Sequence, residues 1–218
     1  SSEEILTSSS RRLCDIARQL IPQFFGTAQC TMLSDDGWNF CEIGQLIERA
    51  AITANAITSI TKPLLQPSIG GGNDHAMEIR LSAFLRLLNS RDIYRRVYQM
   101  RIEPLPLLEL LWTNPVAPRS VVHCLTSCVA RIRGNEINPS PSAARALAEI
   151  ESLIQSILST NWESLLSEQK AQSQGKTRLQ THCEGLLNRL LSLHTILCDS
   201  FLNHQVVMHS ETKPLFQA

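Results

Sequence analysis

Apolar residues recur every three to four positions over most of the chain, which is the spacing of amphipathic α-helices. The first such stretch follows the Ser-rich segment 7–10 and continues to Pro22. The second runs from about Trp38 to Thr61, and we expect it to stop at Pro63 because proline interrupts a helix. We find no two-residue alternation typical of a strand, so the pattern predicts an all-α fold.

Further helical patterns follow a connector at about 62–75, "KPLLQPSIGGGND", whose prolines and glycines are typical of a flexible surface segment. The next stretch is either one helix or two helices separated near Asn89. The predicted helices of this part lie at about 77–101, 104–113 and 118–134.

Two long leucine-rich stripes end the pattern. The first follows the linker "NEINPSPSAARALAEI", with Ser140 or Ser142 as a cap, and reaches about Lys170. The second spans roughly 176–209, and we expect the two to pair antiparallel across the short turn "QSQG". The pattern thus predicts a bundle of about six to seven helices that ends in a long antiparallel pair.

Composition agrees with one ordinary globular domain covering 1–218. Apolar residues make up 43% of the 218 positions and charged residues 18%, and 20 basic side chains balance 20 acidic ones. This balance provides no field for nucleic acid or an anionic membrane, and no apolar run approaches the roughly 20 residues that cross a bilayer. We therefore expect a soluble cytoplasmic chain without nucleic-acid or membrane partners. Because it begins at Ser1, we also expect a fragment or a shortened member of its family.

The cysteines and histidines give little support for a metal or a reactive thiol. The seven cysteines are an odd number scattered through apolar patterns, which favours free thiols in a reducing compartment. His194 with Cys198, and His123 with Cys124 and Cys128, are weak metal candidates because zinc needs three or four converging ligands. No local signature selects a nucleophile with its base. We predict no metal and no cofactor, and favour a chain without catalytic activity of its own.

Glu48 and Arg49 stand side by side inside the second helical pattern. Neighbours in sequence diverge on a helix, so the two charges lie on either side of the outer face with Ile52 between them. One interpretation is that both are solvated. The other is that a second surface covers Ile52 and supplies each charge with a partner, since an unpaired buried charge is costly. The apolar stripe that the two flank consists of Ile43, Leu46, Ile47, Ala50, Ala54 and Ile57.

Two further segments carry candidate binding residues. The run "YRRVYQMR" contains Arg95 and Arg96, which either form a solvated helix face or bind an anion or an acidic partner, because arginine binds carboxylate and phosphate in a bidentate way. In "NPVAPRSVVHC", Arg119 and Ser120 stand at a predicted helix N-terminus, where the helix dipole favours an anion. Helix initiation alone explains Ser120 equally well.

The order of these motifs resembles the second half of the alpha-E family, a bacterial all-helical domain named for a Glu-Arg motif. The resemblance rests on "TMLSDDGWNFCEIGQLIERA" and "YRRVYQMRIEPLPLLELLWTNPVAPRSVVHCL", which together lie within about 31–133. Gln45 departs from the family's arginine after glycine, and "NPVAPRS" is longer than its usual Asn-Pro-Arg-Ser. The family's leading half, with an earlier Glu-Arg helix, is absent.

Members of that family occur beside, or fused to, ATP-grasp peptide ligases and transglutaminase-like proteins. The resemblance therefore implies a non-catalytic helical accessory domain in an ATP-dependent amide-bond-forming system. Two alternatives stay open: an enzyme subunit that binds a small amino acid or peptide in a Glu/Arg-lined pocket, and a structural bundle that forms a homodimer through the leucine stripes of its last two helices. The candidate site residues are Glu48, Arg49, Arg95, Arg96, Arg119 and Ser120.

Overall fold

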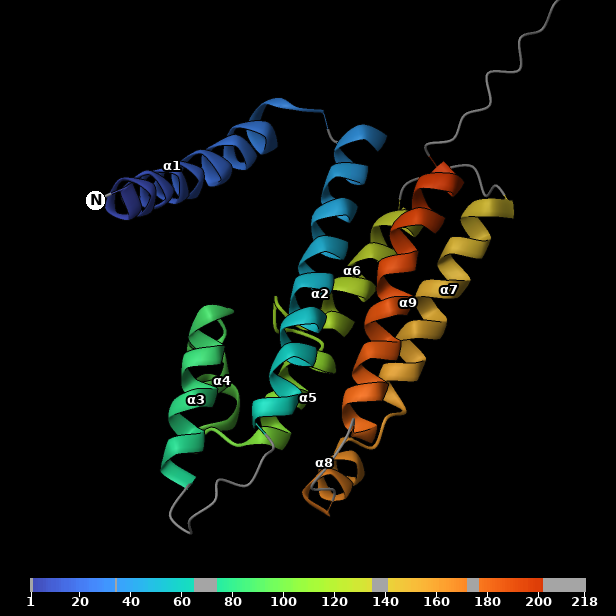
Figure 1. Ribbon diagram of the computed structural model, residues 1–218. Coiled ribbons are helices and arrows are strands. Elements are labelled where there is room, and N and C mark those ends of the chain that lie inside the picture. Colours follow the sequence, from blue (N-terminus) through green and yellow to red (C-terminus); the bar gives the residue numbers. More distant parts are fainter. Residues whose placement is uncertain (1, 34, 65–73, 135–140, 172–176, 202–218) are drawn as a thin grey trace, which may run out of the picture. The chain divides into compact units, whose positions relative to one another are not determined.

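The computed structural model describes residues 2–33, 35–64, 74–134, 141–171 and 177–201 (Figure 1). All regular elements in these ranges are α-helices, which confirms the predicted fold class. There are nine helices in the described ranges, where six to seven were predicted. They are α1 (Ser2–Thr31), α2 (Asp36–Leu64), α3 (Asp74–Leu87), α4 (Arg91–Tyr98), α5 (Pro104–Trp112), α6 (Val121–Gly134), α7 (Pro141–Leu158), α8 (Trp162–Ala171) and α9 (Arg178–Phe201).

The chain divides into two compact units, Ser1–Cys41 and Glu42–Ala218. In the first unit α1 continues through Pro22 to Thr31, so the predicted end at Pro22 was wrong. A proline removes one intrahelical hydrogen bond, and the residues after it keep the helical pattern. Helix α2 then begins where Asp35 Oδ1 accepts a hydrogen bond from the backbone N–H of Trp38 at 3.1 Å, which is the geometry of an N-cap.

The second unit contains most of α2, and its apolar stripe is buried as the sequence predicted. Five of the six stripe residues are buried and Leu46 is half-buried. The helix runs to Leu64 and so passes Pro63, where the sequence predicted a stop. The predicted connector falls mainly on 65–73, outside the described residues. The five buried stripe residues are Ile43, Ile47, Ala50, Ala54 and Ile57.

Helices α3 and α4 are separated by a tight turn, which confirms the option of a break near Asn89. The backbone N–H of Ser90 bonds to Leu85 O at 2.8 Å and that of Asn89 to Arg86 O at 3.0 Å, while Asn89 has a φ of 51°. These are the bonds and the left-handed residue of a Schellman motif, which closes the C-terminus of a helix. The turn fixes the last turn of α3 close to the first turn of α4.

Tyr94 of α4 holds the segment between α4 and α5. Its side chain is buried, and its hydroxyl donates to Arg101 O at 2.9 Å and accepts from the backbone N–H of Glu103 at 3.1 Å. One side chain therefore satisfies two backbone groups that lie outside any helix.

The Tyr94→Phe variant should lower the free energy of unfolding by about 1–3 kcal/mol, because the carbonyl of Arg101 and the N–H of Glu103 lose their common partner. Urea denaturation followed by circular dichroism measures this. Tyr98→Phe is the control, since the Tyr98 ring packs at 4.9 Å from Tyr94 and changes no backbone hydrogen bond. Equal losses for the two variants would show that the hydroxyl of Tyr94 is not what holds this segment.

The C-terminal part of the second unit packs α7 against both α6 and α9 (Figure 1). The guanidinium of Arg189 in α9 donates to Glu149 Oε1 at 2.8 Å and to Ser156 Oγ at 2.7 Å, both in α7. The predicted long helix ending near Lys170 is interrupted, because Asn161 Oδ1 accepts from the backbone N–H of Ser164 at 2.9 Å and caps a new helix, α8. The predicted turn "QSQG" lies outside the described residues.

Three rings join α5, α8 and α9. Trp112 and Trp162 stack with centroids 5.5 Å apart, and the ring of His182 meets Trp162 edge-on at 5.7 Å. The hydroxyl of Thr160 donates to Ser156 O at 2.7 Å, so at 3.0 Å from His182 Nε2 it accepts the ring N–H. Burial lowers the pKa of His182 from its ordinary value, because the charged form loses water.

The protein should therefore lose stability as the pH falls below about 6.5, the ordinary histidine pKa. In that range the unfolded chain binds a proton at His182 that the folded chain resists, so protonation favours unfolding. Urea denaturation at several pH values, repeated with His182→Gln, measures this part of the pH dependence. The variant should show a shallower dependence, whereas identical curves would mean that His182 titrates equally in both states.

Candidate functional site

Glu48 and Arg49 both lie outside the buried stripe of α2. Glu48 is exposed and Arg49 is half-buried, and neither side chain forms a hydrogen bond or ion pair with any side chain that the structure describes. Ile52, one turn further, is 48% exposed. We call Glu48, Arg49 and Ile52 the ER surface. The structure thus places Glu48 and Ile52 on an exposed face and leaves Arg49 half-buried at its edge, without joining the two charges to each other.

Arg49 and Arg119 come from different parts of the sequence, and the charges of both affect the pKa of the Cys124 thiol. Cys124, in the first turn of α6, is fully buried, and burial raises the pKa of its thiol to about 11. The positive charges of Arg49 and Arg119 oppose this rise. The structure therefore brings these two candidate arginines near the start of α6, with a thiol that is too buried to be a reactive nucleophile.

Ser120 has a structural role at the start of α6. It is fully buried, its hydroxyl donates to Trp112 O at 3.3 Å, and its carbonyl accepts from the backbone N–H of Cys124 at 3.0 Å. The preceding loop is held by Asn114 Oδ1, which accepts from the N–H groups of Val116 and Ala117. Ser120 therefore orients the loop that carries Arg119, and its hydroxyl is turned away from solvent.

The two arginines of α4 form a separate group. Arg95 and Arg96 are exposed in the last turn of the helix, where the dipole favours cations. Neither shares an interaction with Arg49 or Arg119 within the described ranges. The sequence candidates thus divide into one set around α2 and the start of α6, and a second set on α4.

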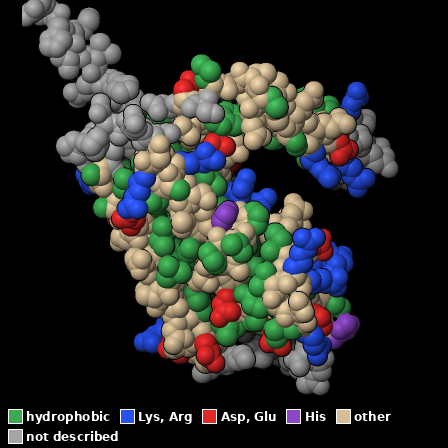
Figure 2. Space-filling view, turned by 180° about the vertical axis from the view of Figure 1, so that it is seen from behind, with side chains coloured by type: hydrophobic (Ala, Val, Ile, Leu, Met, Phe, Trp, Pro, Cys, Tyr) green, Lys and Arg blue, Asp and Glu red, His purple; other side chains and the backbone are tan. Residues whose placement is uncertain are grey.

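Two further arginines lie near Arg95: Arg91, which flanks the run "YRRVYQMR" in the sequence, and Arg86, which sequence reasoning missed. Arg91 and Arg95 are four residues apart on α4, and this spacing in the sequence already indicates that they are neighbours on one side of a helix. Arg86 belongs to the preceding helix, and only the turn at Asn89 shows that it lies near Arg91. Figure 2 shows Lys and Arg side chains in several separate groups with acidic side chains among them, in agreement with the balanced charge.

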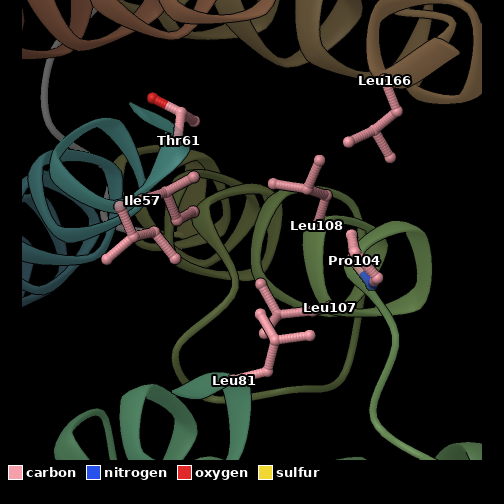
Figure 3. A pocket seen from close by; sticks show the side chains of 8 residues that line it. Ile57, Thr61, Leu81, Pro104, Leu107, Leu108 and Leu166 are labelled. Carbon is pink, nitrogen blue, oxygen red and sulfur yellow. The ribbon is translucent and has the colours of Figure 1, made fainter. Parts of the chain in front are cut away.

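An apolar pocket in the second unit does not suit a polar ligand. Its cavity measures about 10 Å³, which is room for about one water molecule. No candidate residue lines it, and Thr61 provides its one polar side chain (Figure 3). We interpret it as a packing gap. The lining residues are Ile57, Ile60, Thr61, Leu81, Pro104, Leu107, Leu108 and Leu166, from α2, α3, α5 and α8.

The metal candidates of the sequence are not gathered into a site in the described part of the chain. His194 Nδ1 lies 3.7 Å from Cys198 Sγ, but no third ligand joins them, and no group of three His, Cys, Asp or Glu side chains meets there. His123 Nδ1 lies 2.8 Å from Pro115 O. Over the same residues, no helix is both long and apolar enough to span a membrane.

A family model described as a predicted alpha-helical domain with a conserved ER motif matches residues 2–202. The match extends beyond 31–133, on which the sequence resemblance rested. Glu48-Arg49 is the only Glu-Arg dipeptide in the printed sequence, and is therefore the one pair in it that fits the description of the motif. No curated protein and no solved structure matches the chain.

Proposed function

The chain belongs to the alpha-E family, and from the position of its Glu-Arg pair we propose that it is a non-catalytic helical accessory domain that docks onto an ATP-grasp-type peptide ligase. The single observation that carries this proposal is the position of the conserved pair. Conserved charged residues either stabilise the fold through buried partners or contact another molecule. Glu48 and Arg49 have no ion-pair partner among the described side chains, which supports the second role.

The ER surface has the chemistry of a small protein interface. Ile52 follows Glu48 by four residues and Arg49 by three, so its exposed side chain is next to both charges. Interfaces combine apolar contacts with arginine near their centre and polar groups at the rim. A partner that fits this surface places an acidic group against Arg49, a basic group against Glu48 and an apolar side chain against Ile52.

Two observations favour docking over the alternatives. The apolar cavity between α2, α3, α5 and α8 is about 10 Å³, far too small for an amino acid, and none of the candidate charges lines it, so this cavity is not the Glu/Arg-lined pocket of the enzyme alternative. The second concerns the leucine stripes expected to form a homodimer, of which Leu153, Leu186 and Leu190 are buried in a unit where α7 packs on α9. These three side chains are therefore not free to bind a second copy.

Co-expression of the full-length protein with an ATP-grasp-type ligase of its own organism tests the proposal. We expect the two to co-purify and to bind with a micromolar or lower Kd in isothermal titration calorimetry. A transglutaminase-like protein of the same organism is the second partner to test, and an unrelated ATP-grasp enzyme is the negative control. Absence of a complex with both candidate partners at micromolar concentrations would contradict the proposal.

A further inference from the structure

Three arginines that the docking proposal does not use gather around the turn between α3 and α4. Arg86 lies in the last turn of α3 and Arg91 is the first residue of α4, and the Schellman bonds at Asn89 hold the two helix ends together. Arg95 follows Arg91 by one turn of α4, on the same side of the helix. We call Arg86, Arg91 and Arg95 the arginine cluster.

Two members of the cluster repel the third. The pKa of Arg91 is lowered by burial and then by the positive charges of Arg86 and Arg95, and only Asp92 acts in the opposite sense. None of the three forms an ion pair with an acidic side chain in the described ranges. Other arginines of the same unit do: Arg101 lies 3.2 Å from Glu78, Arg178 lies 3.0 Å from Glu168 and Arg189 lies 2.8 Å from Glu149.

Two features of the surroundings of Arg91 also favour a bound anion: an Nε–H without a partner and a position at a helix N-terminus. Its Nε atom is buried and has no hydrogen-bond partner among the described residues. The side chain is at the N-terminus of α4, where the helix dipole disfavours a cation. The hydroxyl of Ser90 does not cap this helix, because it donates to Leu88 O at 3.1 Å instead. An anion beside the three guanidinium groups would reduce the repulsion that Arg86 and Arg95 exert on Arg91.

We propose that Arg86, Arg91 and Arg95 bind the phosphoryl group of a phosphate monoester. Three guanidinium groups and the carboxylate of Asp92 leave two uncompensated positive charges. A phosphate monoester carries about 1.5 to 2 negative charges at pH 7, whereas a carboxylate carries one and would leave the cluster positive. Arginine binds phosphate through paired N–H groups, which suits a site built from guanidinium groups alone.

Titration of the full chain with inorganic phosphate, followed by NMR of the arginine Nε–H groups, tests the site. The ionic strength is held constant by exchange against sodium chloride. We expect the signal of Arg91 to shift with saturation, and acetate to bind more weakly. The Arg91→Gln variant should lose about tenfold or more in phosphate affinity, the effect of removing a charged hydrogen-bond donor. Arg145→Gln, which removes an exposed arginine of α7 without a described ion pair, is the control and should retain the affinity.

Arg95→Gln provides a second test at an exposed position, should Arg91→Gln fail to fold. An unchanged affinity in the folded variants, or acetate binding as tight as phosphate, would overturn the proposal. The source of the phosphoryl group is distinguished by comparing a nucleoside monophosphate with a short phosphoserine peptide, each against its unphosphorylated form. The arginine cluster shares no residue with the ER surface. A negative phosphate titration therefore does not affect the docking proposal, and absence of a complex with the ligase does not affect the phosphate proposal.

Discussion

Replacement of Trp112 by alanine should lower the free energy of unfolding by about 3–5 kcal/mol, a large share of the total for a protein of this size. Trp112 is fully buried in α5 and stacks on Trp162, the first residue of α8. Removal of the indole leaves a cavity between elements that are 50 residues apart in sequence, and the flat face of Trp162 loses its partner. The effect should therefore exceed that of any other single change considered above.

Guanidinium denaturation of the full chain, followed by far-ultraviolet circular dichroism, measures this effect. Leu191→Ala is the matched control, because Leu191 lies in α9 with 53% of its surface exposed, and its loss should be small. Trp112→Phe keeps part of the buried area and should lie between the two. A loss below about 1 kcal/mol for Trp112→Ala would mean that the stacked rings are not a main part of the core.

Reversal of both charges of the ER surface, Glu48→Lys with Arg49→Glu, should weaken binding to the ligase by at least about tenfold, or about 1.4 kcal/mol. Each new charge then meets a like charge on the partner, and such contacts cost several kcal/mol at an interface. The free energy of unfolding should change by no more than about 0.5 kcal/mol, because neither side chain has an ion-pair partner among the described side chains.

Isothermal titration calorimetry with the purified partner measures the loss of binding. Arg145→Glu with Glu163→Lys is the control, since it reverses one positive and one negative exposed charge on α7 and α8. Equal weakening by both double variants would show a general electrostatic effect. If the Glu48→Lys/Arg49→Glu protein binds as tightly as the wild type, the ER surface does not form the contact.

The sequence predicted those parts of the fold that depend on local periodicity. The stripe of α2 needed only helical spacing, and Ile43, Ala50 and Ile57 are buried as expected. Helix ends were less predictable, because they depend on single hydrogen bonds. Pro22 does not end α1, whereas the amide of Asn161 starts α8 inside a pattern that otherwise favours one continuous helix.

The candidate site could be predicted only in part for a related reason. The outward position of Glu48 follows from helical spacing, and the structure agrees. The proximity of Arg49 and Arg119 to Cys124 depends on how α2 packs beside α6, which no local pattern contains. Likewise, Arg86 joins Arg91 through a turn in which Asn89 adopts a left-handed conformation. Such a turn usually carries glycine at the left-handed position, so Asn89 indicated the turn only weakly in the sequence.

Photo-cross-linking from position 52 tests the docking of the ER surface most directly. A benzophenone amino acid replaces Ile52 in one protein and Leu191 in another, two exposed apolar positions with similar exposed fractions of 48% and 53%. Irradiation with the ATP-grasp-type ligase should give a covalent product from position 52 and none from position 191. Product from position 191 alone, or in equal yield from both positions, would contradict docking through the Glu48-Arg49 face.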